Sequence, residues 1–470
     1  PYIDKAFEPS DELLLPRLSF KECAEKCAAD YERAAQLLPE NWDTHPAGLR
    51  TKGHNDLRIT KVCALGYMGK VLLYAASPFN VHGASTGVKN LTLTYEYDTE
   101  MAKRAADALG KALALVEGGS TPYALAEYKY TDIYNHTPDK SATTNFSDIF
   151  YTTGKNWQMP GSVEAIMRGP IPDVNGSNWN FTKLWGPKVN GLVEHDAVIH
   201  MPTANYVNYA YGMANGLPIT DPESGFNPEQ PFKDRDPRFY HDIVFDGEMY
   251  INGTPTGFEN QKYATLHTGG IQRDVSVGSR TGYFCQKLIP HQGNKVDGWT
   301  DQWGRGFKCY LPYMRVAEVY LMYAEACAAA GGASYKASSC THTAEDAINV
   351  VRDRVGVGHV AAKYVANEKL FMDEIRRERA CELAFEGFRF NDLQRWLLLT
   401  ESPYTLKTSQ EFDRVEGEAW YTENDPREAK VKNWREETIL KRNYGTKHYW
   451  FPLLEKEVYI YEGFSQNPGW

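Results

Sequence analysis

The sequence contains no long apolar run. A helix that crosses a bilayer needs about 18 or more consecutive apolar residues, and no stretch approaches that, so we expect no membrane-spanning helix. Hydrophobic residues make up 42% and charged residues 24% of the 470 residues, as in ordinary globular proteins. The opening residues, PYIDKAFEPSDELLLPRLSF, do not have the basic and apolar pattern of a secretory signal. Localisation therefore has to be inferred from other features.

An excess of positive charge is also absent. The 51 Lys and Arg residues are outnumbered by 61 Asp and Glu residues, and the formal net charge is −10. Binding to DNA or RNA is driven largely by cationic side chains that release counterions from phosphates. The charge balance therefore predicts no nucleic-acid partner.

Cysteine is present, but not in metal-binding patterns. The eight cysteines include no CxxC pair and no Cys/His quartet at zinc spacing, so we predict no metal site. Cys23 and Cys27 would share one face of a helix, while Cys327 and Cys381 lie in apolar helical stretches where a free thiol acts as a small hydrophobe. Cysteine usage leaves the redox compartment open.

The helical pattern is strong at both ends of the chain. Ser19 followed by Glu22 has the spacing of a capping box, and the other predicted helices end at glycine or before proline. Small residues such as Ala64, Gly66 and Gly69 would let a neighbouring helix approach closely. The predicted helices are 20–38, 57–76, 99–119, 314–332, 343–356 and 369 to about 385.

The middle of the chain has a different character. Residues 121–310 are rich in Tyr, Trp, Asn, Gly and Pro, with short strand candidates such as DIVFDGEMYI at 242–251. We predict a mainly α fold: a tetratricopeptide-like helical repeat scaffold with a loop-rich insertion containing short strands. The expected division is a helical scaffold at 1–120, a ligand-binding insertion at 121–310, and a C-terminal helical scaffold and tail at 311–470.

Several short motifs resemble functional sites but favour structural roles. GASTG at 83–87 matches a serine nucleophile elbow, but the helix precedes it and the strand-like segment follows, the reverse of the required order. GVGHVA at 356–361 resembles a dinucleotide fingerprint, yet it ends a helix and is better explained as a helix stop. Six N-x-S/T sequons give weak support for glycosylation, at Asn90, Asn135, Asn145, Asn175, Asn180 and Asn252.

The densest charge lies in RRERACELAFEGFRFNDLQRW at 376–396. Glutamates recur every four residues from 374 to 386 and would follow one side of a helix. Spacing of three residues predicts local partners for all but one of them, in the pairs Glu374 with Arg377, Glu382 with Arg379, and Glu386 with Arg389. Glu378 has no local partner, so we predict one from another element, most readily an arginine or a backbone amide of the Met314 helix. We expect this ladder to join helices, with Phe385, Phe388 and Trp396 as core.

This stretch resembles the signature of the SusD/RagB family of outer-membrane nutrient-binding lipoproteins, E-R-x-x-E-L-x-x-E-G-x-R-x-x-D-L-x-R-W. Other segments follow in the family's order: RVAEVYLMYAEACAAAGG at 315, AINVVRDRVG at 347, NGLPITDPESGFNPEQPFKDRDPRF at 215 and the terminal YWFPLLEKEVYIYEGFSQNPGW. TKGHNDLRITKVCALGYMGKVLLYAASP at 51–78 is also similar to a family helix.

The resemblance implies a Bacteroidetes cell-surface protein on tetratricopeptide-like helices that binds oligosaccharide, or another nutrient such as peptide. It would deliver the ligand to a SusC-like TonB-dependent outer-membrane transporter. Its contact with the membrane would be only through a lipid anchor absent from this chain, since family members carry a lipoprotein cysteine and further helices ahead of the segment that starts PYID. The family binds without catalysis, so we expect no enzyme activity, catalytic residue, metal or cofactor.

The family motif fixes no ligand residues, so candidates come from chemistry. Sugar rings have apolar C–H faces flanked by hydroxyls, which suit aromatic rings beside Asn, Asp or Arg. The aromatic content is 13%, and its densest polar mixtures are NGSNWNFTKLWGP at 175–187, NYVNYAYG at 205–212 and VDGWTDQWGRG at 296–306. The predicted ligand-binding residues are Trp179, Trp185, Asn178, Tyr206, Tyr209, Trp299, Asp301 and Trp303. Some of these rings are equally explained as core.

Two other functions remain open on the sequence alone. One is a secreted helical glycoside hydrolase with a pair of carboxylates in a cleft, which would generate new reducing ends from oligosaccharides. The other is a scaffold or adhesin without a small ligand, whose melting temperature no glycan or peptide would change.

Overall fold

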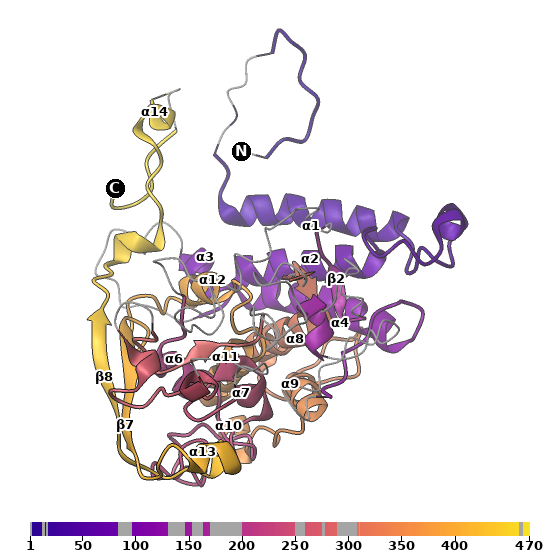
Figure 1. Ribbon diagram of the computed structural model, residues 1–470. Coiled ribbons are helices and arrows are strands. Elements are labelled where there is room, and N and C mark those ends of the chain that lie inside the picture. Colours follow the sequence, from indigo (N-terminus) through magenta and orange to yellow (C-terminus); the bar gives the residue numbers. More distant parts are fainter. Residues whose placement is uncertain are drawn as a thin grey trace.

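The computed structural model describes residues 2–11, 15, 17–82, 96–129, 146–152, 163–169, 200–249, 259–274, 278–288, 308–309, 311–459 and 464–470. The long helices come from the two ends of the chain and lie side by side in Figure 1: α1 (Phe20–Leu37), α2 (Lys61–Ala76), α4 (Thr99–Glu117), α8 (Val316–Gly331), α9 (Ala344–Val355) and α11 (Glu368–Glu382). The prediction of a mainly α fold is confirmed.

Local capping explains where these helices begin and end. The Ser19 side chain accepts from the Glu22 amide, and the Glu22 carboxylate accepts from the Ser19 amide, which completes the predicted capping box of α1. Gly356 ends α9 with φ of 74°, a left-handed conformation that suits glycine, so GVGHVA is a helix stop as predicted. The GASTG motif and all six sequons lie outside the described residues.

The scaffold is a stack in which α1 packs on α2, α2 on α4, α4 on α8, and α8 on both α9 and α11. Small residues make the contacts close, as the sequence predicted. A Cβ added at Gly69 would lie 2.3 Å from Leu109 Cγ, and one at Gly66 would lie 2.6 Å from Met314 Sδ. Cys327 is fully buried in the same core, and Cys381 is buried in a neighbouring one.

Short elements surround this stack. The short helices are α3 (Pro78–His82), α6 (Ala204–Ala210), α7 (Pro237–Asp242), α10 (Ala362–Val365), α12 (Arg389–Arg395), α13 (Trp420–Glu423) and α14 (Glu455–Val458). Short antiparallel pairs join distant segments: β1 (Tyr151–Thr152) with β5 (Lys308–Cys309), β2 (Ala165–Met167) with β6 (Met314–Arg315), and β3 (Ile243–Val244) with β4 (Phe284–Cys285). Of the strand candidate at 242–251, the structure describes residues 242–249, and within these the strand β3 is two residues long.

A long hairpin that the sequence did not predict forms one side of the molecule. Strands β7 (Leu406–Arg414) and β8 (Val431–Lys441) pair antiparallel, with β8 at the left edge of Figure 1. Residues 408–412 of β7 are buried, whereas most of β8 is exposed. Phe412 and Val431 join a second core with residues of α6 and α7. The hairpin therefore ties the tail to the middle of the chain.

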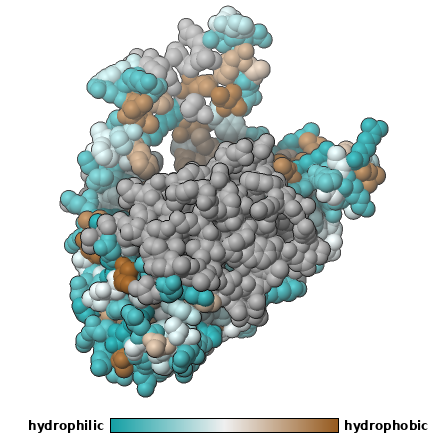
Figure 2. Space-filling model, viewed as in Figure 1, coloured by the Kyte–Doolittle hydropathy of each residue, from teal (hydrophilic) through white to brown (hydrophobic). Residues whose placement is uncertain are grey.

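On the face shown in Figure 2, hydrophilic residues dominate the coloured area and hydrophobic ones occur in small groups. Among the helices of the described ranges, none combines the length and the apolar character needed to cross a bilayer. This agrees with the absence of long apolar runs in the sequence.

Candidate functional site

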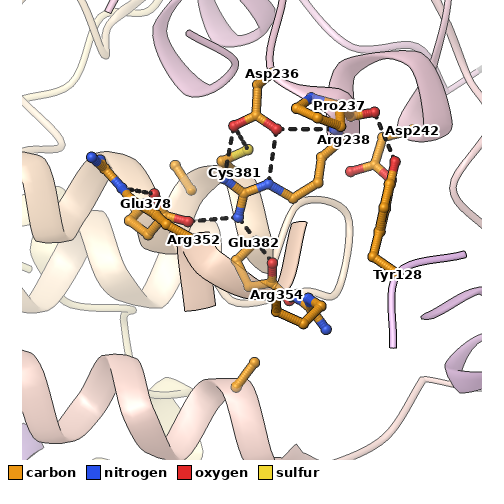
Figure 3. Close-up of polar contacts among 12 residues, drawn as sticks. Tyr128, Asp236, Pro237, Arg238, Asp242, Arg352, Arg354, Glu378, Cys381 and Glu382 are labelled. Atoms are coloured by element: carbon orange, nitrogen blue, oxygen red, sulfur yellow. Dashed lines mark hydrogen bonds and ion pairs between the residues drawn. The ribbon is translucent and has the colours of Figure 1, made fainter. Parts of the chain in front are cut away.

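The first part of the charged stretch, residues 376–384, is buried. Glu378 and Glu382 on α11 are 1% and 0% exposed, and Arg238 of α7 reaches both. Figure 3 shows Arg238 between these glutamates and Asp236, with Arg352 on the far side of Glu378. With no exposed surface, these groups hold elements together and offer no open site to a ligand. The prediction of a structural ladder is thus supported.

The partners of this ladder differ in part from those predicted by spacing. Glu374 does pair with Arg377, at 2.7 Å. Glu382 does not pair with Arg379. It pairs instead with Arg238 at 3.0 Å, with Arg315 at 2.7 Å and with Arg354. Arg379 pairs with Asp392 at 2.7 Å and with Glu318 at 3.5 Å. Three-residue spacing predicts a possible neighbour but does not exclude a better one from another element.

Glu378 takes its partners from other elements, as expected, but not from the Met314 helix. It accepts hydrogen bonds from Arg238 Nη1 at 2.5 Å and Arg352 Nε at 2.8 Å. Burial alone would raise the pKa of Glu378, but the charges of these two arginines outweigh it and lower the pKa to about 2. Trp396 is fully buried as predicted, while Phe385 and Phe388 are only half-buried.

The predicted pair of Glu386 with Arg389 is also wrong, so Arg389 makes other contacts. Glu386 binds Lys287 at 3.0 Å and Arg315 at 2.8 Å, so its carboxylate is already occupied by two cations. Arg389, the first residue of α12, instead lies over aromatic rings. Its guanidinium carbon is 5.1 Å from the ring centroid of Tyr209 and 5.4 Å from that of Tyr404. These distances are those of cation–π contacts.

Arg389 and these rings line a cavity of about 270 Å³. Helix α6 supplies Tyr206 and Tyr209, which are three residues apart and so share one helix face. Tyr404 comes from the turn before β7, and Arg389 from the start of α12. The other lining residues are Met201, Pro202, Thr203, Asn205, Leu393, Pro403, Leu406, Lys407 and Arg442. We call this cavity the tyrosine pocket.

The protein holds the tyrosine pocket firmly. The Asn205 amide nitrogen of the backbone donates to Thr408 Oγ1 at 2.8 Å, and its side chain donates to the Leu406 carbonyl at 3.0 Å, which fixes α6 on β7. The Tyr206 hydroxyl donates to the Ala380 carbonyl at 2.6 Å. Tyr209 and Tyr404 meet edge to face at 86°, with ring centroids 6.0 Å apart. The pocket is therefore formed before any ligand arrives.

Tyr206 and Tyr404 of the pocket are neutral hydrogen-bonding groups at physiological pH. Burial raises the pKa of Tyr206 above its usual value, although the nearby charge of Arg389 opposes this. Burial, followed by proximity to Tyr209, likewise raises the pKa of Tyr404. The pocket thus combines ring surfaces and hydroxyls with the fixed positive charge of Arg389, a set suited to a polar ring-shaped ligand.

The structure brings two of the predicted ligand residues together, and their role in ligand binding stays a prediction. Tyr206 and Tyr209 both line the pocket. The remaining candidates lie outside the described residues: Trp179, Trp185, Asn178, Trp299, Asp301 and Trp303. Sequence reasoning missed Arg389 and Tyr404. The FRF segment around Arg389 contained the signal, because an arginine between aromatic residues need not pair with the nearest glutamate.

A smaller cavity of about 140 Å³ is lined by residues from 41–60, 122–123 and 165–168, among them Trp42 and Arg168. Its groups already engage one another. Arg168 pairs with Asp56 at 2.7 Å, and the Arg58 guanidinium covers the Trp42 ring at 5.0 Å. This cavity offers less free aromatic and ionic surface than the tyrosine pocket. Within the described ranges, no group of three or more His, Cys, Asp and Glu side chains could hold a metal ion.

Comparisons with known proteins agree with this fold. A model of the SusD family matches residues 164–470. The chain is similar to a SusD-like protein of Bacteroides fragilis, with TM-score 0.66 and 23% identity over 100% of this chain and 75% of that one. It is also similar to a SusD-like carbohydrate binding protein of the same species, with TM-score 0.54 and 19% identity over 93% of this chain and 71% of that one. No curated protein matches the sequence.

Proposed function

The chain belongs to the SusD family, and from this premise we propose that it binds oligosaccharide at the cell surface and delivers it to a SusC-like TonB-dependent transporter. The observation that carries the proposal is the tyrosine pocket. A similar structure is described as a carbohydrate binding protein, which supports the same ligand class. The alternative ligand is another nutrient, such as a peptide.

The chemistry of the tyrosine pocket suits a sugar. Ring faces of Tyr209 and Tyr404 can pack against the C–H face of a pyranose, while Arg389 and the hydroxyls of these two tyrosines can bind its oxygens. A volume of about 270 Å³ is near the lower end of the range for ligand pockets, about 300–1,000 Å³. The pocket would therefore hold one or two sugar units, and a longer chain would extend beyond it.

The position of the pocket also bears on how the chain is divided. We keep the boundaries at residues 120 and 310 as a proposal. Tyr206 and Tyr209 belong to the middle segment, and Arg389 and Tyr404 belong to the C-terminal segment. On this proposal, ligand binding uses the seam between the two segments rather than the insertion alone. The unplaced candidates Trp179 and Trp299 stay proposed contacts for further sugar units.

Isothermal titration with an oligosaccharide panel tests the proposal. Tyr209→Ala should weaken binding of any sugar that binds by roughly 2- to 10-fold, since one stacking ring is lost. Tyr459→Ala removes a ring that is 77% exposed and outside the pocket, so it is the matched control. Equal affinities for both variants and the parent would show that the tyrosine pocket is not the site.

Separate measurements test the role in uptake. We propose a binder without catalysis, so incubation with the bound sugar should release no new reducing ends; their appearance would favour the glycoside hydrolase instead. The proposed transporter should copurify with the protein from outer membranes, and externally added protease should degrade the protein on intact cells. Failure of both would contradict the surface role while leaving sugar binding intact.

A further inference from the structure

We propose that the tyrosine pocket selects an acidic sugar, a uronate or a sulfate ester, over a neutral one. This inference rests on the proposed function and specifies its ligand. It follows from the charges around the pocket and from the way in which Arg389 is held. The shared chemistry of both ligands is a planar or tetrahedral oxyanion attached to a sugar ring.

The tyrosine pocket is positively charged in a protein whose net charge is −10. Arg389, Lys407 and Arg442 line it, and its described lining includes no Asp or Glu. All three cations are half-buried, and in the described part of the chain none of them forms an ion pair. Partly buried cations that lack a counter-charge favour an anionic ligand.

The carboxylates around the pocket have other partners, and Asp373, whose charge acts on Tyr404, pairs with Arg376 at 3.0 Å. Glu386, three residues before Arg389, is buried and shared by Lys287 and Arg315. Glu436 on β8 accepts from Asn208 Nδ2 at 2.6 Å and from Thr408 Oγ1 at 2.8 Å. In the described part of the chain none of these carboxylates forms an ion pair with Arg389, so an anionic ligand would supply that pair.

Arg389 is also held in a suitable way. Its guanidinium carbon lies 5.7, 5.1 and 5.4 Å from the ring centroids of Tyr206, Tyr209 and Tyr404. Such contacts hold the cation through its π face and leave the N–H groups at its edge to donate. The planar fork of those donors matches two oxygens of a carboxylate or sulfate. A sugar acid could thus bind Arg389 through its anion and pack its ring on a tyrosine.

The test compares four probes by isothermal titration: trigalacturonate, its neutral methyl ester, a sulfated galactose disaccharide that has no carboxylate, and triglutamate. We expect trigalacturonate or the sulfated disaccharide to bind at least about tenfold more tightly than the ester. That preference should shrink as NaCl rises from about 50 to about 500 mM, because salt screens the ion pair. The stronger of the two acidic sugars identifies the anion as carboxylate or sulfate.

Arg389→Gln isolates the role of the guanidinium. It should weaken the acidic sugar about tenfold and change binding of the ester less than about twofold. Lys369→Gln removes an exposed lysine outside the pocket and should change neither. In the described part of the chain Arg389 forms no ion pair, but the substitution removes its contacts with three rings, so the melting temperature is measured as well. Arg442→Gln is the second variant if the melting temperature falls.

The other outcomes overturn the inference in distinguishable ways. Equal binding of trigalacturonate and its ester, or equal weakening of both by Arg389→Gln, refutes acidic selectivity and leaves sugar binding standing. Binding of triglutamate alone refutes an acidic sugar and favours a peptide nutrient. If none of the four probes binds, the acidic sugar is refuted, and the wider oligosaccharide panel decides separately whether sugar binding stands.

Discussion

Replacing Glu378 by glutamine should destabilise the protein by about 3 kcal/mol at neutral pH. The Glu378 carboxylate lies between Arg238 and Arg352, with hydrogen bonds of 2.5 and 2.8 Å, and the residue is 1% exposed. Glutamine has nearly the same shape, but it is neutral and turns an amide N–H₂ toward one of the two guanidinium groups. The substitution therefore removes the charge while leaving the packing in place.

Two estimates of the magnitude agree. The pKa of Glu378 falls from 4.5 to about 2 on folding, and about 1.4 kcal/mol for each pH unit gives about 3 kcal/mol. Breaking a buried ion pair from one side costs about 3–5 kcal/mol. The lower end applies because Arg238 keeps Asp236 and Glu382, and Arg352 keeps Glu374 as a partner.

The effect should depend on pH in one direction. Since the pKa of Glu378 is lower in the folded protein than in the unfolded chain, the stabilisation is present in full above about pH 4.5. It is lost as the pH falls toward about 2, where the folded protein also binds the proton. The difference between parent and Glu378→Gln should therefore be largest at neutral pH and shrink in acid.

Denaturant unfolding followed by tryptophan fluorescence, at about pH 7, 5 and 3.5, measures this difference. Glu100→Gln is the control, because the Glu100 side chain is 81% exposed and its pair with Lys103 lies at the surface. The reasoning is refuted if Glu378→Gln unfolds like the control at neutral pH, or if its deficit stays constant down to about pH 3.5.

Two further predictions concern packing and reactivity. Gly69→Ala should lower the free energy of unfolding by about 1–3 kcal/mol despite better helix propensity, because its Cβ would lie 2.3 Å from the buried Leu109 Cγ. Gly417→Ala is the control, since no heavy atom lies within 4 Å of the added Cβ. Equal melting temperatures of the two variants would contradict the close contact. Burial raises the pKa of Cys63 and of Cys327 to about 12, so iodoacetamide at mildly alkaline pH should leave both unmodified by mass spectrometry until denaturant is added. Rapid labelling of either thiol in the native protein would contradict its burial.

The long helices could be predicted from the sequence because their signals are local. Ser19 with Glu22 and the glycine at 356 set ends that the structure reproduces within a residue or two. The β7–β8 hairpin was missed because β8 is mostly exposed, so its sequence VKNWREETILK lacks the alternation of a half-buried strand. A strand of that kind is defined by its partner rather than by its own pattern.

The same distinction explains the candidate site. Aromatic density was enough to select Tyr206 and Tyr209, since both lie on one short helix. Arg389 was assigned to Glu386 by spacing, whereas the structure gives Glu386 to Lys287 and Arg315, which are 99 and 71 residues away. Competition between near and distant partners is settled only by the folded chain. Because Glu386 pairs with these distant cations, Arg389 lines the tyrosine pocket instead.

The Glu382 carboxylate also determines how the molecule would respond to a broken backbone. It binds Arg238, Arg315 and Arg354, which belong to stretches of chain far apart in the sequence, and the glutamate is fully buried. A peptide bond cleaved between Arg238 and Arg315 would leave Arg238 on one fragment, and Arg315 with Glu382 on the other. Arg238 would still pair with the Glu382 carboxylate across the cut. The fragments would stay together as a complex, so the protein could lose chain continuity there and keep its shape.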